Sequence, residues 1–283
     1  MSLQRPVYVE CPRDSWQGLH QMVPTPVKAS YLRALLEAGF THLDLGSFVS
    51  PKHVPQMSDT EAVLAELPEP EGRDYLCIIA NPRGLERAAD QPKVRSVGYP
   101  LSISDTFQRR NTGRSLEDSW EVLAELAEGA RAADKRLVVY LSMGFGNPYG
   151  DPWSEEVVVD ALLRIRDLGI RSVALADTVG QADAQTVRQV CSAVVSRLGA
   201  EDLGVHLHAR PERARDLVDA ALASGIRWFE GALGGVGGCP FAGDELVGNL
   251  PTELIADQLD LEVDRVLLDT LAARALELRV RYA

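Results

Sequence analysis

The feature that most constrains the fold is a regular alternation of short apolar segments with longer amphipathic ones. Eight short segments rich in aliphatic and aromatic residues predict buried strands. They span residues 7–11, 41–47, 75–80, 94–102, 136–145, 172–178, 203–209 and 228–233. Strands that alternate with helices form a parallel sheet. Eight such units in roughly 230 residues match the size of a (β/α)8 TIM barrel, an α/β fold, which we predict for this chain.

Five of the longer segments carry helix signals, over residues 25–39, 115–135, 154–169, 182–199 and 210–225. Thr25 is expected to be an N-cap with Pro26 in the first turn, and Ser115 with Asp118 has the spacing of a capping box. A doubly wound open sheet is the alternative, but the stretch after the first strand, VECPRDSWQG, lacks the GxGxxG turn of that fold.

No repeat, linker or low-complexity segment divides the chain, so we predict a single domain over residues 1–283. The barrel is expected over about residues 7–250. Residues 251–283 are expected to form a short C-terminal extension of polar-faced helices that pack outside the barrel or against a partner subunit.

Composition excludes several classes of partner. A formal net charge of −12 argues against a nucleic-acid or anionic-membrane surface. No apolar run approaches the ~18 residues of a membrane span, and MSLQRPVYVECPRD lacks the apolar region of a secretory signal. The cysteines are widely spaced and form no CxxC pair, which predicts free thiols in a reducing cytoplasm. They are Cys11, Cys77, Cys191 and Cys239.

Unusual polar residues lie where predicted strands end, which is where TIM barrels carry their chemistry. Arg13 and Asp14 follow the first strand, and His206 and His208 end the seventh. Side chains two residues apart on a strand share a face, so both imidazoles are expected to point into the barrel mouth. With the Asp14 carboxylate and the Asn249 amide oxygen they would form a mixed nitrogen and oxygen site for a divalent cation. A pair of strand histidines with ordinary hydrogen bonds is the alternative.

Two further groups are expected near this cation. Arg13 carries a permanent charge suited to a carboxylate or a developing enolate, although a structural ion pair with Asp14 is equally compatible with the sequence. Cys239 lies in the glycine-rich stretch GGVGGCPF, which is typical of a mobile lid, and a thiol there can donate or accept a proton. A small buried residue in a tight turn is the alternative for Cys239.

Six segments of the chain resemble hydroxymethylglutaryl-CoA lyases, metal-dependent TIM-barrel lyases related to isopropylmalate and homocitrate synthases. They are PRDSWQG (12–18), GSFVSPKHVPQMSD (46–59), SDTFQRRN (104–111), LADTVG (175–180), VHLH (205–208) and GGVGGCPFAGDELVGN (234–249). The resemblance runs from about residue 7 to about residue 255. The second and last segments are specific to the lyase branch, whereas HxH is shared more widely.

The resemblance implies cleavage of a 3-hydroxy-3-methylglutaryl thioester into acetoacetate and acetyl-CoA. It implies a divalent metal, Mg²⁺ or Mn²⁺, bound by Asp14, His206, His208 and Asn249. The implied catalytic residues are Arg13, Asp14, His206 and Cys239, with Arg13 stabilising the enolate and Cys239 transferring a proton. The implied substrate-binding residues are Gln17, Asp44, Ser47, Asp177 and Thr178.

The expected partners are an acyl-CoA substrate and further copies of the chain, as a dimer or tetramer. Lys52, Arg109 and Arg110 are candidates for the CoA phosphates.

Four places depart from the family pattern. The family has glycine after the Arg-Asp pair, glutamate three residues before the proline, glutamate in strand two and aspartate after the second histidine. This chain has Ser15 followed by Trp16, Val9 followed by Glu10, Asp44, and Ala209 followed by Arg210. Because strand faces alternate, Glu10 does not simply replace the glutamate missing at Val9.

Changes around metal ligands alter metal affinity and substrate orientation. Trp16 either narrows the acyl pocket or only packs, and Arg210 either binds an extra anionic group or only begins a helix. The departures leave open a different acyl-CoA or 2-oxo acid, used in aldol cleavage or Claisen condensation. A barrel that binds a metabolite without catalysis is a third alternative.

Overall fold

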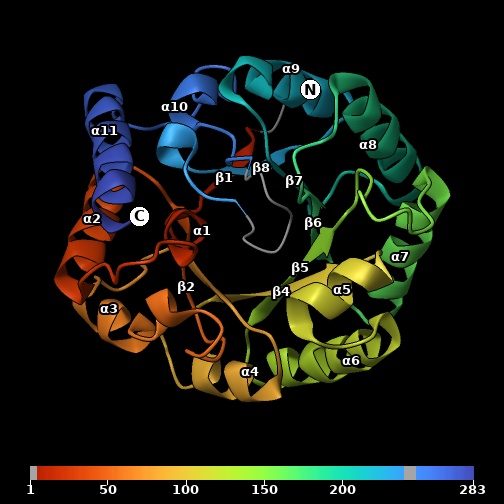
Figure 1. Ribbon diagram of the computed structural model, residues 1–283, viewed down its shortest axis with the longest axis horizontal. Coiled ribbons are helices and arrows are strands. Elements are labelled where there is room, and N and C mark those ends of the chain that lie inside the picture. The colour runs from red at the N-terminus through yellow and green to blue at the C-terminus, as the bar shows by residue number, and fades with distance from the viewer. Residues whose placement is uncertain (1–4, 239–246) are drawn as a thin grey trace.

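The computed structural model describes residues 5–238 and 247–283, and these contain a closed barrel of eight parallel strands (Figure 1). The strands are β1 (Val7–Glu10), β2 (His42–Ser47), β3 (Asp74–Ile78), β4 (Ser96–Ser102), β5 (Arg136–Ser142), β6 (Ser172–Asp177), β7 (Leu203–Leu207) and β8 (Trp228–Gly231). Each pairs with the next in sequence, and β8 closes on β1. The predicted TIM barrel is confirmed.

Alternate residues along each strand face the barrel interior and the helices. The interior is filled by a small apolar cluster that includes Val9, Val138, Tyr140 and Trp228, whereas the opposite faces pack against the helices in a much larger core. Some strands end earlier than predicted. β5 stops at Ser142 because Met143 has a φ of 61°, which no strand residue adopts.

Helices surround the barrel (Figure 1). They are α1 (Pro12–Gln17), α2 (Thr25–Glu37), α3 (Thr60–Glu66), α4 (Pro82–Ala89), α5 (Asp105–Thr112), α6 (Leu116–Ala132), α7 (Glu155–Asp167), α8 (Ala184–Leu198), α9 (Pro211–Ala223), α10 (Thr252–Ile255) and α11 (Arg265–Tyr282), with 3-10 turns η1 (Pro55–Met57) and η2 (Leu233–Gly235). The five predicted helices are confirmed as α2 and α6 to α9. Helices α1, α3, α4 and α5 were not predicted, because six to eight residues are too few to show a clear periodicity.

The helix starts test two local predictions. The capping box is confirmed, since the Ser115 hydroxyl accepts from the Asp118 amide at 3.1 Å and the Asp118 carboxylate accepts from the Ser115 amide at 3.3 Å. The prediction for Thr25 is wrong. Pro24 has the extended backbone of the N-cap, and Thr25 is the first helical residue, whose hydroxyl donates to Asp59 at 2.7 Å.

The C-terminal extension consists of α10 and α11, and α11 lies against α2 at the edge of the molecule (Figure 1). Leu268, Leu271 and Leu278 are its main buried side chains. Among the described residues, no helix is both long and apolar enough to cross a membrane. Three of the four cysteines fall in the described part of the chain, and Cys11, Cys77 and Cys191 are buried free thiols there.

Candidate active site and metal centre

A cavity of about 510 Å³ opens at the carboxyl ends of the strands. This is the end of a TIM barrel at which active sites form, because the loops after the strands converge there. Seven of the residues predicted to be catalytic, to bind substrate or to bind the metal line this cavity. They are Arg13, Asp14, Gln17, Ser47, Thr178, His206 and His208. They come from the first, second, sixth and seventh βα units.

The centre of the site is a cluster of one carboxylate and two imidazoles. Asp14, His206 and His208 are all buried, and their ligand atoms lie within 4.8 Å of one another. His206 Nδ1 pairs with Glu230 Oε2 at 2.8 Å, and His208 Nδ1 pairs with the Val247 carbonyl oxygen at 3.0 Å. Both Nδ1 atoms are therefore engaged, which leaves both Nε2 lone pairs for a cation.

Asn249 completes this set of donors. Its side-chain amide donates to Asp14 Oδ2 at 2.6 Å and to the Val236 carbonyl oxygen at 2.9 Å. Its Oδ1 atom is buried and has no hydrogen-bond partner. An unpartnered buried oxygen costs about 1–3 kcal/mol, which a bound cation would recover. One carboxylate, two imidazoles and one amide oxygen form the mixed set that suits a borderline divalent cation, so the residues fit such an ion.

The protonation states of Asp14 and His208 also suit a cation. Burial raises the pKa of Asp14, but Arg13 and the two histidines outweigh it and bring this pKa to about 2. Burial, and then the charge of His206, lower the pKa of His208 to about 4. Burial also lowers the pKa of His206, but Glu230 more than offsets it and the net shift is upward. At neutral pH Asp14 is ionised and His208 neutral, as metal ligation requires.

Arg13 forms hydrogen bonds with side chains from the first and second βα units. Its Nε lies 3.0 Å from Asp44 Oδ2 and its Nη2 lies 2.5 Å from the same oxygen. Nη1 donates to Asp14 Oδ1 at 3.1 Å and to Gln17 Oε1 at 2.8 Å. Burial opposes the charge of Arg13, but Asp44 and Asp14 outweigh it and raise its pKa. The guanidinium is therefore a fixed cation beside the metal ligands.

Asp44 has a different place from the one predicted. It is fully buried, is absent from the cavity lining and contacts Arg13. Burial raises its pKa to about 6, although Arg13 pulls in the other direction. The carboxylate of β2 thus orients the guanidinium of α1.

The predicted substrate contact of Asp177 is also not supported. Its carboxylate accepts hydrogen bonds from the Gln181 and Ala182 amides at 3.2 and 2.9 Å, and it does not line the cavity. The neighbouring Thr178 does line the cavity, and its hydroxyl accepts from the Met143 amide at 3.1 Å. The alternation of side chains on β6 sends these two residues to opposite faces of the sheet.

The family pattern has a glutamate at the position of Val9, and in this chain a different residue, Glu230, places a carboxylate in the barrel interior next to it. Val9 faces the barrel interior, and its partner across the β1–β8 ladder is Glu230. Glu10 faces outward, where its carboxylate accepts from the Leu233 amide at 2.8 Å and from the Thr252 hydroxyl at 2.6 Å. We did not predict Glu230, although an acidic residue within the apolar strand segment WFEGAL is a usable signal.

The other departures have modest structural roles. Trp16 is buried, contacts Tyr31 edge-on at 5.8 Å and is absent from the cavity lining, which supports the packing alternative. Ser15 donates to the Val236 carbonyl oxygen at 3.2 Å and so ties α1 to the loop after β8. Arg210 is exposed at the N-cap of α9. Cys239 lies outside the described residues.

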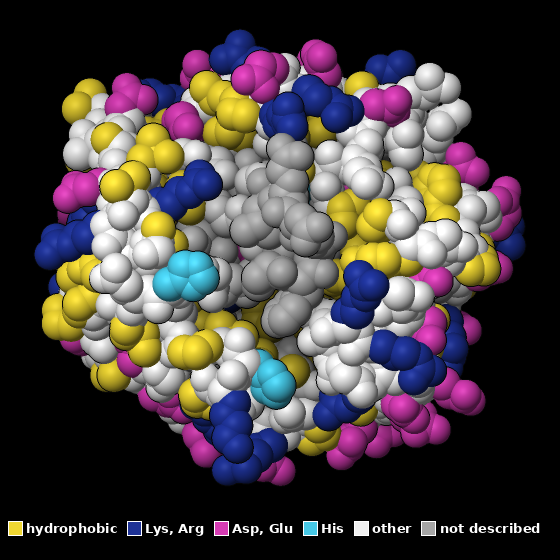
Figure 2. Space-filling view, viewed as in Figure 1, with side chains coloured by type: hydrophobic (Ala, Val, Ile, Leu, Met, Phe, Trp, Pro, Cys, Tyr) yellow, Lys and Arg dark blue, Asp and Glu magenta, His cyan; other side chains and the backbone are white. Residues whose placement is uncertain are grey.

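Basic side chains line the outer part of the cavity. Arg109, Arg110 and Arg114 from α5 and the turn after it are among them, whereas Lys52 is not. Figure 2 shows basic side chains on several sides of the centre of this face, with acidic ones mostly toward the periphery. An acidic protein therefore presents a locally basic entrance, which suits an anionic ligand.

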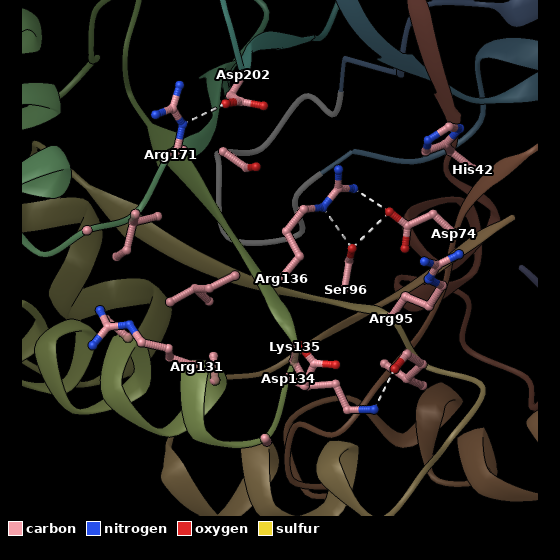
Figure 3. Close-up of a pocket in the computed structure, with 18 of the residues that line it drawn as sticks. His42, Asp74, Arg95, Ser96, Arg131, Asp134, Lys135, Arg136, Arg171 and Asp202 are labelled. Atoms are coloured by element: carbon pink, nitrogen blue, oxygen red, sulfur yellow. Dashed lines mark hydrogen bonds and ion pairs between the residues drawn. The ribbon is translucent and has the colours of Figure 1, made fainter. Parts of the chain in front are cut away.

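A second cavity, of about 950 Å³, lies at the opposite end of the barrel, where β3 to β6 begin (Figure 3). Four of its charged side chains form two ion pairs with one another. Arg136 forms an ion pair with Asp74 and donates to Ser96 at 3.0 Å, and Arg171 pairs with Asp202 at 3.1 Å. At the amino ends of barrel strands such networks serve stability, so the chemistry belongs to the smaller cavity.

Gly237 lets the backbone approach the cluster. Its φ is 112°, and a Cβ atom there would lie 2.5 Å from Asn249 Nδ2 and 2.9 Å from Asp14 Oδ2. We expect Gly237→Ala to fold and to bind Mn²⁺ at least ~10-fold more weakly, because displacing these partners disturbs the ligands. Gly146→Ala is the matched control, with a φ of 119° and open space around its Cβ position. Equal Mn²⁺ affinity of the two variants by titration would contradict this expectation.

Glu10 predicts a pH-dependent stability. Burial raises its pKa from 4.5 to about 8, so the folded state binds this proton more tightly than the unfolded chain does. Its contribution to stability is therefore present below about pH 4.5 and is lost as pH rises toward 8. We expect Glu10→Gln to melt at a higher temperature than the parent at pH 9, with little difference at pH 5. Parallel melting curves across this range would show that Glu10 titrates normally.

The fold and the cluster at its carboxyl end define a class, the TIM barrels whose strand ends carry a set of donors for a divalent metal. The model of the HMGL-like family matches residues 9–277. The chain belongs to the HMGL-like family, and the resemblance seen in its sequence is confirmed.

Two curated relatives illustrate the match. The hydroxymethylglutaryl-CoA lyase of Pseudomonas mevalonii is 31% identical over 242 residues, which cover 86% of this chain and 80% of the relative. The 3-hydroxy-3-isohexenylglutaryl-CoA/hydroxy-methylglutaryl-CoA lyase of Pseudomonas aeruginosa is 33% identical over the same shares of the two chains.

Solved structures agree with this assignment. An HMG-CoA lyase from Acinetobacter baumannii, in complex with coenzyme A and 3-methylmalate, is 30% identical with a TM-score of 0.91 and covers 100% of this chain and 93% of its own. The carboxyl transferase domain of Rhizobium etli pyruvate carboxylase, at 13% identity and a TM-score of 0.70, covers 99% of this chain and 48% of its own and shares the fold alone.

Proposed function

We propose that this chain cleaves 3-hydroxy-3-methylglutaryl-CoA into acetoacetate and acetyl-CoA. The observation that carries the proposal is the convergence of Asp14, His206 and His208 beside Arg13 at the floor of an open cavity. The names of the curated relatives support the substrate, as does a solved relative that holds coenzyme A and a small hydroxy dicarboxylate.

Asp14, His206, His208 and Asn249 are the residues that would hold the cation, and we propose Mg²⁺ or Mn²⁺ in this role. The unpartnered Asn249 oxygen supports the amide as the fourth protein ligand. A divalent cation bound by them supplies Lewis acidity toward the hydroxyl and carbonyl oxygens of a substrate.

The reaction requires the tertiary hydroxyl to pass its proton to a base or to solvent as the neighbouring carbon–carbon bond breaks, and the hydroxyl carbon becomes the ketone carbon of acetoacetate. The electron pair of that bond becomes the enolate of acetyl-CoA, and the enolate carbon then takes up a proton. Arg13 stabilises the enolate, because its charge is permanent and Asp44 and Gln17 hold it in place before substrate arrives. Cys239 is our proposed proton donor on the strength of the family resemblance.

The basic entrance supports an acyl-CoA. Arg109, Arg110 and Arg114 line the outer cavity and are our candidates for the CoA phosphates. Val54, Ile78 and other apolar residues line the same cavity and suit the uncharged part of the ligand. We further propose that the chain works as a cytoplasmic homo-oligomer.

The experiment is to incubate the purified chain with the thioester in the presence of Mg²⁺, Mn²⁺ or a chelator and to follow acetoacetate. We expect product with either ion and none with the chelator. His208→Ala, which removes one ligand, is expected to be inactive. If the folded, metal-loaded chain forms no product, the substrate is wrong, and a panel of other acyl-CoA and 2-oxo acid substrates tests the related lyases and condensing enzymes.

A further inference from the structure

Glu230 is a buried carboxylate that lies beside the metal cluster but outside the cavity. It is on the interior face of β8, is 0% exposed and does not line the cavity. Its Oε2 accepts from His206 Nδ1 at 2.8 Å and from the Cys11 thiol at 3.9 Å, and its Oε1 accepts from the Tyr140 hydroxyl at 3.3 Å. Since it cannot reach substrate, any effect on chemistry has to pass through His206.

We infer that Glu230 is a positioning residue, which presents His206 Nε2 to the cation by holding its Nδ1–H. A neutral imidazole carries one N–H, and the partner of that N–H decides which nitrogen keeps its lone pair for a metal. The Glu230 contact selects the tautomer with Nε2 free and also sets the orientation of the ring. The inference rests on the metal site of the proposed function.

The two histidines differ in how they are held, which makes the inference specific. His208 donates its Nδ1–H to a backbone carbonyl, that of Val247, at 3.0 Å. A side-chain substitution cannot remove that acceptor. His206 depends on a side chain, and the charge of a carboxylate strengthens the imidazole as a ligand more than a neutral carbonyl does. A change at Glu230 should therefore alter one ligand and leave the other in place.

Tyr140 supports the same arrangement, because it contacts both His206 and Glu230. Its ring packs edge-on against His206 at 5.9 Å between centroids, and its hydroxyl donates to the free oxygen of Glu230. The Glu230 carboxylate thus has a hydrogen-bond partner on each oxygen, and the Tyr140 ring packs against the His206 imidazole. The ring contact restricts the rotation of His206, and the hydroxyl contact holds the carboxylate that accepts from it.

Cys11, His206 and Glu230 also lie close enough together to hold a cation by themselves. We favour the positioning role, because His206 Nδ1 and Glu230 already satisfy each other and Cys11 is a buried thiol that donates to Glu230. Burial also raises the pKa of Cys11, which disfavours the thiolate that a metal would need. The number of ions bound per chain separates the two possibilities.

The test compares Glu230→Gln and Glu230→Ala with the parent by titration with Mn²⁺, followed through the electron paramagnetic resonance of the free ion. Gln keeps an acceptor but loses the charge, and Ala loses both. We expect Mn²⁺ affinity to fall about 10-fold in Glu230→Gln and about 100-fold in Glu230→Ala. Circular dichroism and thermal melting of the metal-free variants check the fold, and Glu230→Gln serves if Glu230→Ala does not fold.

Glu10→Gln is the matched control. It removes a second buried carboxylate, on the adjacent strand β1, whose partners Leu233 and Thr252 lie outside the cluster. We expect its Mn²⁺ affinity to equal that of the parent. The visible spectrum of the Co²⁺-loaded protein should change in the Glu230 variants and not in this control, which a merely structural role of Glu230 would not produce.

Three outcomes overturn the inference. The first is unchanged Mn²⁺ affinity in a folded Glu230→Ala variant while the parent binds Mn²⁺, and this leaves the proposed metal site intact. The second is that the parent binds two Mn²⁺ ions per chain and the Glu230 variants bind one, which would make Glu230 a metal ligand. The third is no Mn²⁺ binding by the parent, which removes the metal site of the proposed function as well. A parent that binds Mn²⁺ but cleaves no thioester overturns the proposed substrate alone.

Discussion

Replacing Asp14 with asparagine is expected to weaken Mn²⁺ binding by more than about 100-fold and to reduce lyase activity to background. Asp14 is the one anion among the four proposed ligands, and its pKa of about 2 keeps it ionised throughout the useful pH range. Partners that only support a ligand are worth about 10–100-fold in affinity, so the loss of a charged ligand should exceed that. Titration with Mn²⁺ and the acetoacetate assay measure the two effects.

Asp183→Asn is a suitable control for Asp14→Asn. Asp183 is the N-cap of α8 and accepts from the Thr186 amide at 2.7 Å, and asparagine caps helices about as well as aspartate. The control makes the same chemical change away from the cavity and should behave like the parent. An Asp14→Asn variant that bound Mn²⁺ normally would remove Asp14 from the ligand set.

Replacing Arg13 with lysine is expected to lower kcat by about 10²- to 10³-fold, with a smaller effect on KM. The guanidinium reaches Asp44, Asp14 and Gln17 at once, whereas an ammonium is a single point of charge and cannot form that fork. The charge would remain but would lose its position relative to the enolate. Steady-state kinetics at saturating Mn²⁺ test this, and a kcat close to that of the parent would exclude a role for the geometry of Arg13.

A stability measurement separates the contribution of the Arg13–Asp44 ion pair to folding from its contribution to catalysis. Arg13→Met leaves Asp44 buried without a partner, which should cost about 3–5 kcal/mol at neutral pH. The pKa of Asp44 is already raised to about 6, so its ionised form is the costly one and the loss should shrink as pH falls toward 5. The double variant Arg13→Met with Asp44→Leu should regain stability at pH 7 and remain inactive.

The part of the site that could be predicted from the sequence consists of residues whose local context is unusual. His206 and His208 are two polar residues on one face of an apolar strand, and Arg13 with Asp14 follows another strand directly. Parallel strands of a barrel end on the same side, so alternation of strands and helices was enough to expect these residues near one another.

The rest of the site could not be predicted, because it depends on distances in space between residues far apart in the chain. Asp44 was expected to contact substrate, but it is fully buried and pairs with Arg13, 31 residues away. Glu230 reaches His206 across the β7–β8 ladder, and no local pattern specifies that partner. Asp177 and Thr178 were both expected to bind substrate, but side chains alternate along β6, so Thr178 lines the cavity while Asp177 accepts from a backbone amide.

What the sequence determined by itself is the set of elements and their order, because strand and helix periodicities and the caps of helices are local properties. It also determined that the polar groups would meet at the carboxyl end of the barrel. Only the tertiary structure decided which groups touch: that Asn249 hydrogen-bonds to Asp14 across 235 residues and keeps one oxygen unpartnered, and that Glu230 faces the barrel interior beside Val9. The physical reason is that barrel closure and strand register, which bring these atoms within hydrogen-bonding distance, depend on the packing of the whole chain.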